Sequence, residues 1–255
     1  MRPIFKMHGG KFYLSKFLID LFPDDYYLLD YGEPFCGAAS VLINKIPSKQ
    51  EFINDIDPGI ISIFRELQER PVEFITALKK LTYEGNTFLQ VIGKCDPISE
   101  FILRRMSRGG LKKDFSWSDR LRGGKPGDVN AFETILELLP EIADRIKNVK
   151  IYNKPAMEVI EMYNREDVFL YLDPPYLPET RTSLNIYFQE MTKKNHFELF
   201  EVLKGFKGKV LISNYYSDVY RKLYKSWNCY KKIVVNNASQ SKIKPFKIEC
   251  AWTNY

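Results

Sequence analysis

The residues best suited to chemistry in this 255-residue chain are Asp173, Pro174, Pro175 and Tyr176. They follow an apolar run, 168–172, whose β-branched and aromatic residues predict a fully buried strand. Because proline cannot donate to a strand ladder, the two prolines must end that strand. Asp173 and the Pro174 carbonyl could then accept hydrogen bonds from the amine of a planar substrate, with Tyr176 stacked on its ring. An ordinary strand-ending turn is the alternative explanation, since Asp-Pro is common in turns.

Two further predicted strand ends carry groups that could bind a ligand. Residues 30–40, DYGEPFCGAAS, join a strand to a small-residue turn at Gly37, which lets a ligand approach the backbone closely. The turn could equally serve packing alone. Asp55 ends the predicted strand 51–55, about 20 residues after that turn, where an acidic side chain can accept hydrogen bonds from ribose hydroxyls. Asp57 could do the same, but its place directly before a predicted helix favours a capping role.

The elements that must position these residues alternate between short apolar runs and longer amphipathic ones. This alternation predicts an α/β fold: a doubly wound, mostly parallel sheet with helices on both faces. The predicted strands are 26–31, 51–55, 149–152, 168–172 and 209–213, with CYKKIVVN and FKIECAWTNY forming a final antiparallel pair. The predicted helices are 11–22, about 37–45, 58–69, 131–146, 156–163, 193–206 and 217–227. Ligands of such sheets bind outside the carboxyl ends of the strands.

The segment from about Cys95 to Gly127 interrupts the alternation. It contains the glycine-rich stretches SRGG and LRGGKPG and the aromatic residues Phe115 and Trp117. We interpret it as the first part of an inserted module that continues into the helix near 131–146. The expected domains are therefore a catalytic domain of residues 1–94 and 148–255 and an inserted, mostly helical module of residues 95–147.

Basic residues concentrate in two segments, although the net charge of +6 is modest. Residues 101–130 hold eight basic side chains against three acidic ones, and residues 221–247 hold eight basic and no acidic ones. Lysines on a solvated face or an edge strand would explain either segment alone. Two such segments favour a polyanionic partner, nucleic acid.

Cysteine, histidine and apolar content argue against several classes of protein. The four cysteines are scattered without a CxxC pair, and the chain has two histidines, so we expect reduced thiols and no metal site. No apolar run is long enough to cross a bilayer, and the N-terminal MRPIFKMHGG lacks the apolar stretch of a signal peptide. We expect a cytoplasmic protein without a membrane partner.

Six motifs, in this order, resemble the Dam-type (DPPY, alpha-group) adenine-N6 DNA methyltransferases, especially their phage and prophage branch. They are HGGK (8–11), EPFCGAAS (33–40), NDID (54–57), RMSRGGL (105–111), LDPPY (172–176) and SNYYS (213–217), and they cover nearly the whole chain. The resemblance implies a Rossmann-like enzyme of restriction-modification type. Such an enzyme transfers a methyl group from S-adenosylmethionine to N6 of a flipped adenine at a specific DNA sequence. It also implies a monomer or weak dimer in a bacterial or phage-infected cell.

The resemblance implies three sets of site residues. Those for the cofactor are His8, Gly10, Lys11, Glu33, Pro34, Phe35, Gly37, Ala38, Asp55 and Asp173, with Asp55 on the ribose. The catalytic loop that holds the adenine is Asp173, Pro174, Pro175 and Tyr176. The DNA contacts, from a target-recognition module over 95–147, are Arg105, Arg108, Lys112, Lys113, Arg120 and Arg122. No metal ligand is implied.

The chain departs from the family pattern at two positions. Ala39 stands where the family's FxGxG motif has its last glycine, and because alanine is small we expect little harm. Pro155 stands where an acidic residue often lies beside the cofactor adenine. In the stretch 187–196, Tyr187 resembles a residue that helps form the pocket, whereas His196 is expected to be a helix or surface residue.

Two alternatives to a DNA adenine methyltransferase stay open at this point. One is a methyltransferase that acts on another amine: cytosine N4, an RNA adenine or a protein glutamine. The other is a non-catalytic DNA-binding protein that keeps the fold but has lost the cofactor, to which Pro155 lends support.

Overall fold

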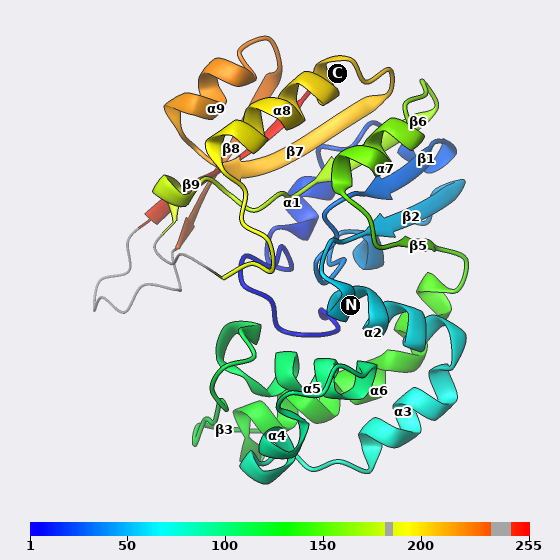
Figure 1. Cartoon of the computed structure of the whole chain (residues 1–255), viewed down its shortest axis with the longest axis vertical. Coiled ribbons are helices and arrows are strands. Elements are labelled where there is room, and N and C mark those ends of the chain that lie inside the picture. Colours follow the sequence, from blue (N-terminus) through cyan, green and yellow to red (C-terminus); the bar gives the residue numbers. More distant parts are fainter. Residues whose placement is uncertain (182–185, 236–245) are drawn as a thin grey trace. The chain divides into compact units, whose positions relative to one another are not determined.

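A computed structural model of the chain describes residues 1–181, 186–235 and 246–255, which form two compact units (Figure 1). The first unit contains Met1–Ile19, Gly37–Lys45 and Asp57–Asn153, and the second contains Asp20–Cys36, Ile46–Ile56 and Lys154–Tyr255. Residues 57–94 thus group with residues 95–147, so the structural division differs from the expected domain boundaries. Whether 95–147 acts as a separate functional module stays a prediction.

A sheet forms the centre of the second unit. Its strands lie in the order β2 (Gln50–Asn54), β1 (Asp30–Glu33), β6 (Val168–Leu172), β7 (Lys209–Tyr215), β9 (Phe246–Thr253) and β8 (Asn228–Val235). The first four are parallel, and β9 is antiparallel to both β7 and β8. The structure confirms the α/β class and the final antiparallel pair.

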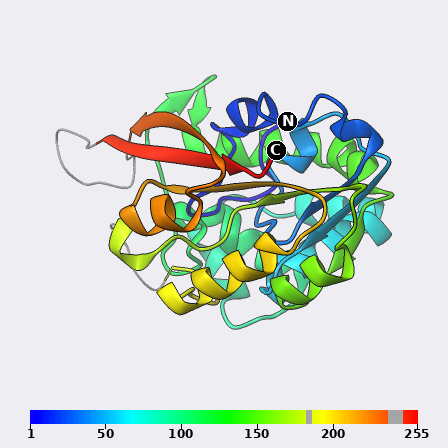
Figure 2. The same cartoon turned by 90° about the horizontal axis from the view of Figure 1, so that it is seen from above.

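The connections in the second unit place helices against this sheet. Helices α7 (Ala156–Met162) and α8 (Lys193–Lys204) lie side by side along one face (Figure 2). Each of them precedes a parallel strand, β6 or β7, as in a βαβ crossover. Helix α9 (Asp218–Leu223) follows β7 directly. Strand β6 is buried along its whole length, as its apolar sequence predicts.

The first unit is mostly helical. Its main helices are α2 (Pro58–Glu69), α3 (Pro71–Lys79), α4 (Gly85–Val91), α5 (Pro97–Met106) and α6 (Gly127–Ile146). The shorter elements are α1 (Ser15–Ile19), a hairpin of β3 (Leu121–Arg122) and β4 (Lys125–Pro126), and β5 (Lys150–Tyr152). Proline begins α2, α3 and α5, where its missing N–H is not needed.

Asp57 has the capping role that its position predicts. Its carboxylate accepts a hydrogen bond from the Gly59 N–H at 2.9 Å at the start of α2. It also forms a buried ion pair of 2.6 Å with Arg104 of α5. The first contact satisfies a helix-end donor, and the second fastens α2 to α5.

Two predicted elements near the N-terminus are shorter than expected. The expected strand 26–31 begins only at Asp30, because Tyr26–Leu28 form a 3₁₀ turn. The expected helix 11–22 is limited to Ser15–Ile19.

The expected helix over 37–45 is wrong. Gly37 and Ala39 adopt φ angles of +49° and +47°, which a right-handed helix does not permit. Only Leu42–Asn44 turn, as a 3₁₀ helix. The turn after β1 is therefore an irregular loop whose shape depends on two left-handed residues.

Two glycines from distant motifs abut the same N-terminal dipeptide in the first unit. A side chain at Gly110, whose φ is +74°, would place its Cβ 1.9 Å from the Lys6 carbonyl oxygen. One at Gly37 would place its Cβ 2.7 Å from the Met7 sulfur. The motifs EPFCGAAS and RMSRGGL thus both pack against the chain directly before HGGK.

We predict that Gly110→Ala destabilises the protein more than Gly109→Ala does. Gly109 also has a left-handed φ, +62°, but its nearest neighbour would lie 3.9 Å from the new Cβ. Gly109→Ala should therefore cost about 1 kcal/mol of unfolding free energy from backbone strain alone. Gly110→Ala should cost about 3 kcal/mol, because overpacking against a backbone carbonyl adds to that strain. If urea titration gave the same decrease in the free energy of unfolding for both variants, the contact between Gly110 and Lys6 would be contradicted.

Candidate active site

The carboxyl ends of four parallel strands in the second unit meet at one edge of the sheet. Glu33 ends β1, Asp55 follows β2, Asp173 follows β6, and Ser213 lies near the end of β7. The strand register pairs Glu33 with Ile53 and Leu172 with Ile212, so these ends are level. This edge gathers the predicted site residues of the second unit: Glu33, Pro34, Phe35, Asp55, Asp173, Pro174, Pro175 and Tyr176.

Ser213 holds the carboxylate of Asp173. Its hydroxyl lies 3.1 Å from Asp173 Oδ1, as a donor, and 3.0 Å from the Tyr171 hydroxyl. Burial, reinforced by the Asp173 charge, raises the pKa of Tyr171 well above its usual value, so this phenol stays protonated. Tyr171 can therefore donate to Ser213 while Ser213 donates to Asp173. This relay orients the half-buried carboxylate and gives the SNYYS motif a structural role.

Tyr176 is fixed at both its hydroxyl and its ring. The hydroxyl donates to the carboxylate of Glu249 on β9, and the ring meets Tyr215 edge to face, with centroids 4.9 Å apart. Burial, then the charges of Asp173 and Glu249, raises the pKa of Tyr176 well above its usual value. The residue is 4% exposed, so its ring is held in place before any substrate binds. Glu249 is a site residue that the sequence did not indicate.

Asn54 fastens the turn after β1 to the segment before α7. Its side-chain amide donates to the carbonyls of Pro34 at 2.9 Å and Lys154 at 3.0 Å, and it accepts from the Lys154 N–H at 2.9 Å. Its backbone carbonyl accepts from the Cys36 N–H at 2.9 Å. Asn54 is completely buried, so these bonds are costly to lose. The sequence indicated it only as part of NDID.

Glu33 is buried beside a neutral phenol. The Tyr31 hydroxyl donates to Glu33 Oε1 at 2.8 Å, and burial followed by the charge of Glu33 raises the pKa of Tyr31 well above its usual value. A carboxylate has several acceptor positions, so Glu33 can accept further donors. With Asp55 at the same edge, the second unit offers two carboxylates for hydroxyl or ammonium groups. This set of acceptors fits the ribose and amino-acid ends of S-adenosylmethionine.

The other residues predicted for the cofactor lie in the first unit. The HGGK stretch closes on itself: Lys11 Nζ donates to the Gly9 carbonyl at 2.7 Å, and the Gly10 N–H donates to the Met7 carbonyl at 3.2 Å. His8, Gly37 and Ala38 belong to the same unit. The structure thus groups the predicted cofactor residues into two subsets, one in each unit.

Arg105 does not fit the predicted DNA surface. It is 7% exposed, and its guanidinium donates to the Ala131 carbonyl of α6 at 2.7 Å. Burial lowers its pKa to about 10, and the negative charge of Asp128 partly opposes this shift. Because a buried guanidinium cannot reach a phosphate, we correct this prediction: Arg105 supports the packing of α5 against α6.

The other predicted DNA contacts lie on or near the surface of the first unit. Arg108, Lys113, Arg120 and Arg122 are exposed, and Lys112 is partly buried with its ammonium 3.0 Å from Glu100. Two of these flank or lie on the β3–β4 hairpin, where Leu121 is 65% exposed. Trp117, four residues before Leu121, is 49% exposed. This hairpin region therefore offers cations and apolar side chains together.

The second basic segment, 221–247, is described only in part. Its residues 221–235 and 246–247 belong to α9, β8, β9 and the turn between α9 and β8, whereas 236–245, with two of its lysines, lie outside the described residues. Its role in binding DNA stays a prediction.

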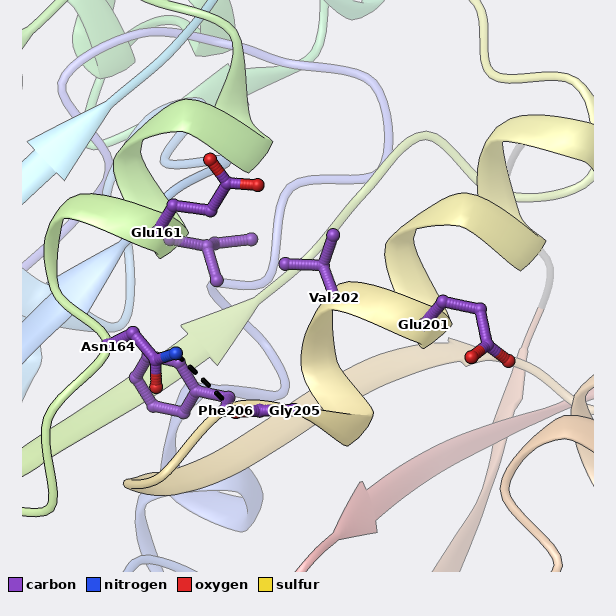
Figure 3. Close-up of a pocket in the computed structure, with 7 residues that line it drawn as sticks. Glu161, Asn164, Glu201, Val202, Gly205 and Phe206 are labelled. Atoms are coloured by element: carbon purple, nitrogen blue, oxygen red, sulfur yellow. Dashed lines mark hydrogen bonds between the residues drawn. The ribbon is translucent and has the colours of Figure 1, made fainter.

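A cavity of about 250 Å³ lies elsewhere in the second unit. It is lined by Ile160, Glu161, Asn164, Glu201, Val202, Gly205 and Phe206, with the Asn164 amide donating to the Gly205 carbonyl at 3.4 Å (Figure 3). These residues stand at the ends of α7 and α8 from which the chain enters β6 and β7. The cavity therefore belongs to the amino-terminal edge of the sheet, opposite Asp173, and takes no part in the site.

Neither a membrane-spanning helix nor a metal cluster occurs among the described residues. No helix within 1–181, 186–235 and 246–255 has the length and apolar character needed to cross a membrane. In the same part of the chain, no three histidine, cysteine, aspartate or glutamate side chains gather where they could hold a metal ion.

A sheet whose four parallel strands present DPPY and further carboxylates at their carboxyl ends defines a Rossmann-like, S-adenosylmethionine-dependent methyltransferase. The chain belongs to the D12 class of N6 adenine-specific DNA methyltransferases, whose family model matches residues 8–98 and 130–240. It therefore transfers a methyl group from S-adenosylmethionine to N6 of adenine in DNA. This confirms the resemblance and decides against the other amine targets, while the phage branch stays a prediction. Residues 99–129, inside the predicted insertion, lie between the two matched ranges.

Curated relatives of similar length carry type II methyltransferase names. M1.LlaDCHI of Lactococcus lactis subsp. cremoris is 26% identical, over 100% of this chain and 96% of the relative. M.MjaIII of Methanocaldococcus jannaschii is 24% identical, over 92% and 91%, and M.CviBI of Paramecium bursaria Chlorella virus NC1A is 25% identical, over 88% and 86%.

Solved structures are more distant. SMU.1697c from Streptococcus mutans, in complex with SAH, is 12% identical over 99% of this chain and 98% of that one, with a TM-score of 0.38. The rRNA methyltransferase aviRa from Streptomyces viridochromogenes is 11% identical over 99% and 87%, with a TM-score of 0.41. At such low identity and TM-score, neither protein indicates the substrate of this chain.

We predict that Ala39→Gly leaves stability nearly unchanged, whereas Ala38→Gly lowers it. Both alanines are buried, so each change removes a methyl group whose burial contributes about 0.8 kcal/mol to the free energy of unfolding. Each change also makes the unfolded chain more flexible, which lowers that free energy by about 0.7 kcal/mol more. At Ala39, whose φ is +47°, glycine also relieves about 1–2 kcal/mol of left-handed strain. The unfolding free energy should therefore fall by about 1.5 kcal/mol for Ala38→Gly alone. Equal decreases in the free energy of unfolding of the two variants, measured in urea, would contradict backbone strain at Ala39.

Proposed function

We propose that the loop Asp173–Tyr176 holds the target adenine. The observation that carries this proposal is the 3.1 Å hydrogen bond by which Ser213 orients Asp173 at the carboxyl end of β6. In this proposal Asp173 and the Pro174 carbonyl accept the two amine protons of the adenine, and Tyr176 stacks on its ring. With both protons drawn to acceptors, the nitrogen lone pair points away from them and toward an electrophile.

The adenine must leave the DNA duplex before this loop can hold it. Unstacking costs about a few kcal/mol, which stacking on Tyr176 and phosphate contacts would offset. S-adenosylmethionine, when bound, supplies a methyl group on a positively charged sulfur. Asp173 then faces the positive charge that develops on the adenine nitrogen, and its preset orientation avoids reorganisation at that moment. Neither a covalent enzyme intermediate nor a nucleophilic cysteine is required.

We infer that the second unit supplies a cofactor-binding edge of its own. Asp55 takes the ribose hydroxyls, and the turn at Glu33, Pro34 and Phe35 lines the site there. Two features support this assignment. The carboxylates of Glu33 and Asp55 supply acceptor oxygens, and the hydrogen bonds of Asn54 fix the turn after β1. The cofactor roles of His8, Gly10, Lys11, Gly37 and Ala38, which belong to the first unit, stay predictions.

We infer that the DNA surface is narrower than the sequence suggests. Arg108, Lys113, Arg120 and Arg122 remain as exposed cations, with Lys112 tied to Glu100 and Arg105 internal. The hairpin and Trp117 would supply contacts for sequence-specific recognition.

We further propose that the protein is a site-specific, adenine-specific DNA methyltransferase of a restriction-modification system. We expect it to be a monomer or weak dimer in the cytoplasm. Type II names among the relatives support the assignment to restriction-modification systems, and the viral origin of one relative supports the phage branch. We place the protein in the cytoplasm because its DNA substrate is found there in bacterial and phage-infected cells.

Asp173→Ala should lower methyl transfer to DNA by about 100- to 1000-fold, because it removes the acceptor that meets the developing charge. Binding of S-adenosylmethionine, measured by calorimetry, should stay nearly intact. The assay is tritiated-methyl transfer to DNA, with mass analysis of the nucleosides to identify N6-methyladenine. Ser213→Ala is the comparison variant. It keeps the Asp173 carboxylate but removes the hydrogen bond that orients it, so methyl transfer should fall by about 10-fold. Full activity of Asp173→Ala would refute the assignment.

Changing Arg120 and Arg122 together to Gln should weaken DNA binding and its salt dependence. For every phosphate that the variant no longer neutralises, the slope of log K against log [salt] should become shallower by about 0.9. The matched control changes Lys79 and Lys80 to Gln, which removes the same charge from an exposed helix end outside the basic segments. Fluorescence anisotropy with a labelled duplex at several salt concentrations measures the slopes. If the two double variants share one slope, the hairpin arginines do not contact DNA.

A further inference from the structure

His196 lies directly beneath the catalytic loop. The sequence placed it on a helix or the surface; the helix is confirmed, but the residue is completely buried. A capping box formed by Thr192 and Asn195 fixes where α8 begins, and the His196 N–H donates to the Thr192 carbonyl at 3.2 Å. The first turn of α8 therefore sets the position of the imidazole.

The imidazole has a partner on each side. The Tyr220 hydroxyl lies 3.3 Å from both ring nitrogens, and the Pro175 carbonyl lies close enough to the ring to accept from it and to oppose the fall in its pKa. Burial lowers the pKa of His196 to about 4, so the ring is neutral at physiological pH. A neutral imidazole has one donor and one acceptor nitrogen, which match the Pro175 carbonyl and the Tyr220 hydroxyl.

Tyr220 completes a closed chain of hydrogen bonds. Ser217 caps α9 and accepts from the Tyr220 N–H at 3.2 Å, and the Tyr220 hydroxyl accepts from the Leu177 N–H at 3.3 Å. Burial raises the pKa of this phenol well above its usual value, so it stays a donor toward the imidazole. The chain runs from the Leu177 N–H through Tyr220 and His196 to the Pro175 carbonyl. It spans the backbone on both sides of Tyr176.

The loop depends on such outside partners because of its own composition. Pro174 and Pro175 lack an N–H, so they cannot anchor the loop by donating to neighbouring strands. The Leu177 N–H and the Pro175 carbonyl are the backbone groups that the chain of bonds engages. Without it, the N–H of the buried Leu177 would lack a partner, and the loop would be free to shift. A shift of about 1 Å at a reacting group can cost about 100-fold in rate.

We propose that His196 and Tyr220 are positioning residues that hold the backbone around Tyr176 in the shape needed for methyl transfer. This inference rests on the proposed function of the Asp173–Tyr176 loop. Both residues act through the loop and need not touch the substrate. They complement the contacts of Ser213 with Asp173 and of Glu249 with Tyr176, which hold side chains of the loop rather than its backbone.

The test compares Tyr220→Phe with Tyr224→Phe. Tyr224 stands one turn further along, is equally buried, and its hydroxyl has no hydrogen-bond partner among the residues that the structure describes. Tyr220→Phe should lower kcat for DNA methylation by about 10- to 100-fold, with the Kd for S-adenosylmethionine within about twofold of wild type. Tyr224→Phe should match wild type in both. Equal kcat values for the two variants would overturn the proposal.

Substitutions of His196 separate hydrogen bonding from packing. His196→Gln keeps one donor and one acceptor on a side chain of similar reach, so it should retain more activity than the apolar His196→Leu. Because both residues belong to one chain of bonds, the His196→Leu, Tyr220→Phe double variant should be within about twofold of the weaker single variant. Multiplied effects in the double variant would show that the two residues act separately.

Amide hydrogen exchange of Leu177, measured by NMR on the protein without DNA, gives a readout independent of activity. Exchange should accelerate by at least about 10-fold in Tyr220→Phe, which removes its acceptor, and stay unchanged in Tyr224→Phe. If Asp173→Ala keeps full activity, the proposed function of the loop fails, while the exchange rates still report whether Tyr220 holds the loop backbone. Unchanged Leu177 exchange in Tyr220→Phe, or faster exchange without a fall in kcat, would overturn the positioning role.

Discussion

The site depends on the abrupt end of a buried strand in two prolines. Strand β6 carries Asp173 to the carboxyl edge of the sheet, and the prolines stop the strand there by removing two donors. That constraint leaves a loop which cannot hydrogen-bond to neighbouring strands in the ordinary way. The surrounding elements supply what it lacks: Ser213 on β7, Glu249 on β9 and His196 on α8. The sheet and its helices thus fix the position of the loop residues Asp173, Pro174, Pro175 and Tyr176.

Buried phenols recur around this loop, and burial gives them a single chemical role. The pKa values of Tyr31, Tyr171, Tyr176 and Tyr220 are all raised well above the usual value, with desolvation as the leading cause. Each therefore keeps its proton and can donate to an acceptor of fixed position. Donors that do not titrate suit a site whose acceptors, Glu33, Asp173 and Glu249, must keep their orientation across the pH range of activity.

The sequence predicted those features that depend on neighbouring residues. The strand before DPPY, the antiparallel end of the sheet and the capping role of Asp57 follow from local patterns, and the structure has them. The helix expected over 37–45 failed because the left-handed φ of Ala39 is not encoded by its side chain. The bonds of Asn54 to Lys154 and of Tyr176 to Glu249 join residues far apart in sequence, so composition and spacing could not reveal them.

Burial also divides the basic residues that composition counts as one group. Arg104 and Lys112 form ion pairs with Glu100, Lys6 pairs with Asp128, and Arg105 donates to a backbone carbonyl. These contacts hold the helices and the N-terminal segment of the first unit together, and a cation so engaged is poorly placed to release counterions from DNA. In the first unit, exposed cations remain at and around the β3–β4 hairpin. The number of basic residues in a segment therefore overstates how many of them are exposed and able to contact DNA phosphates.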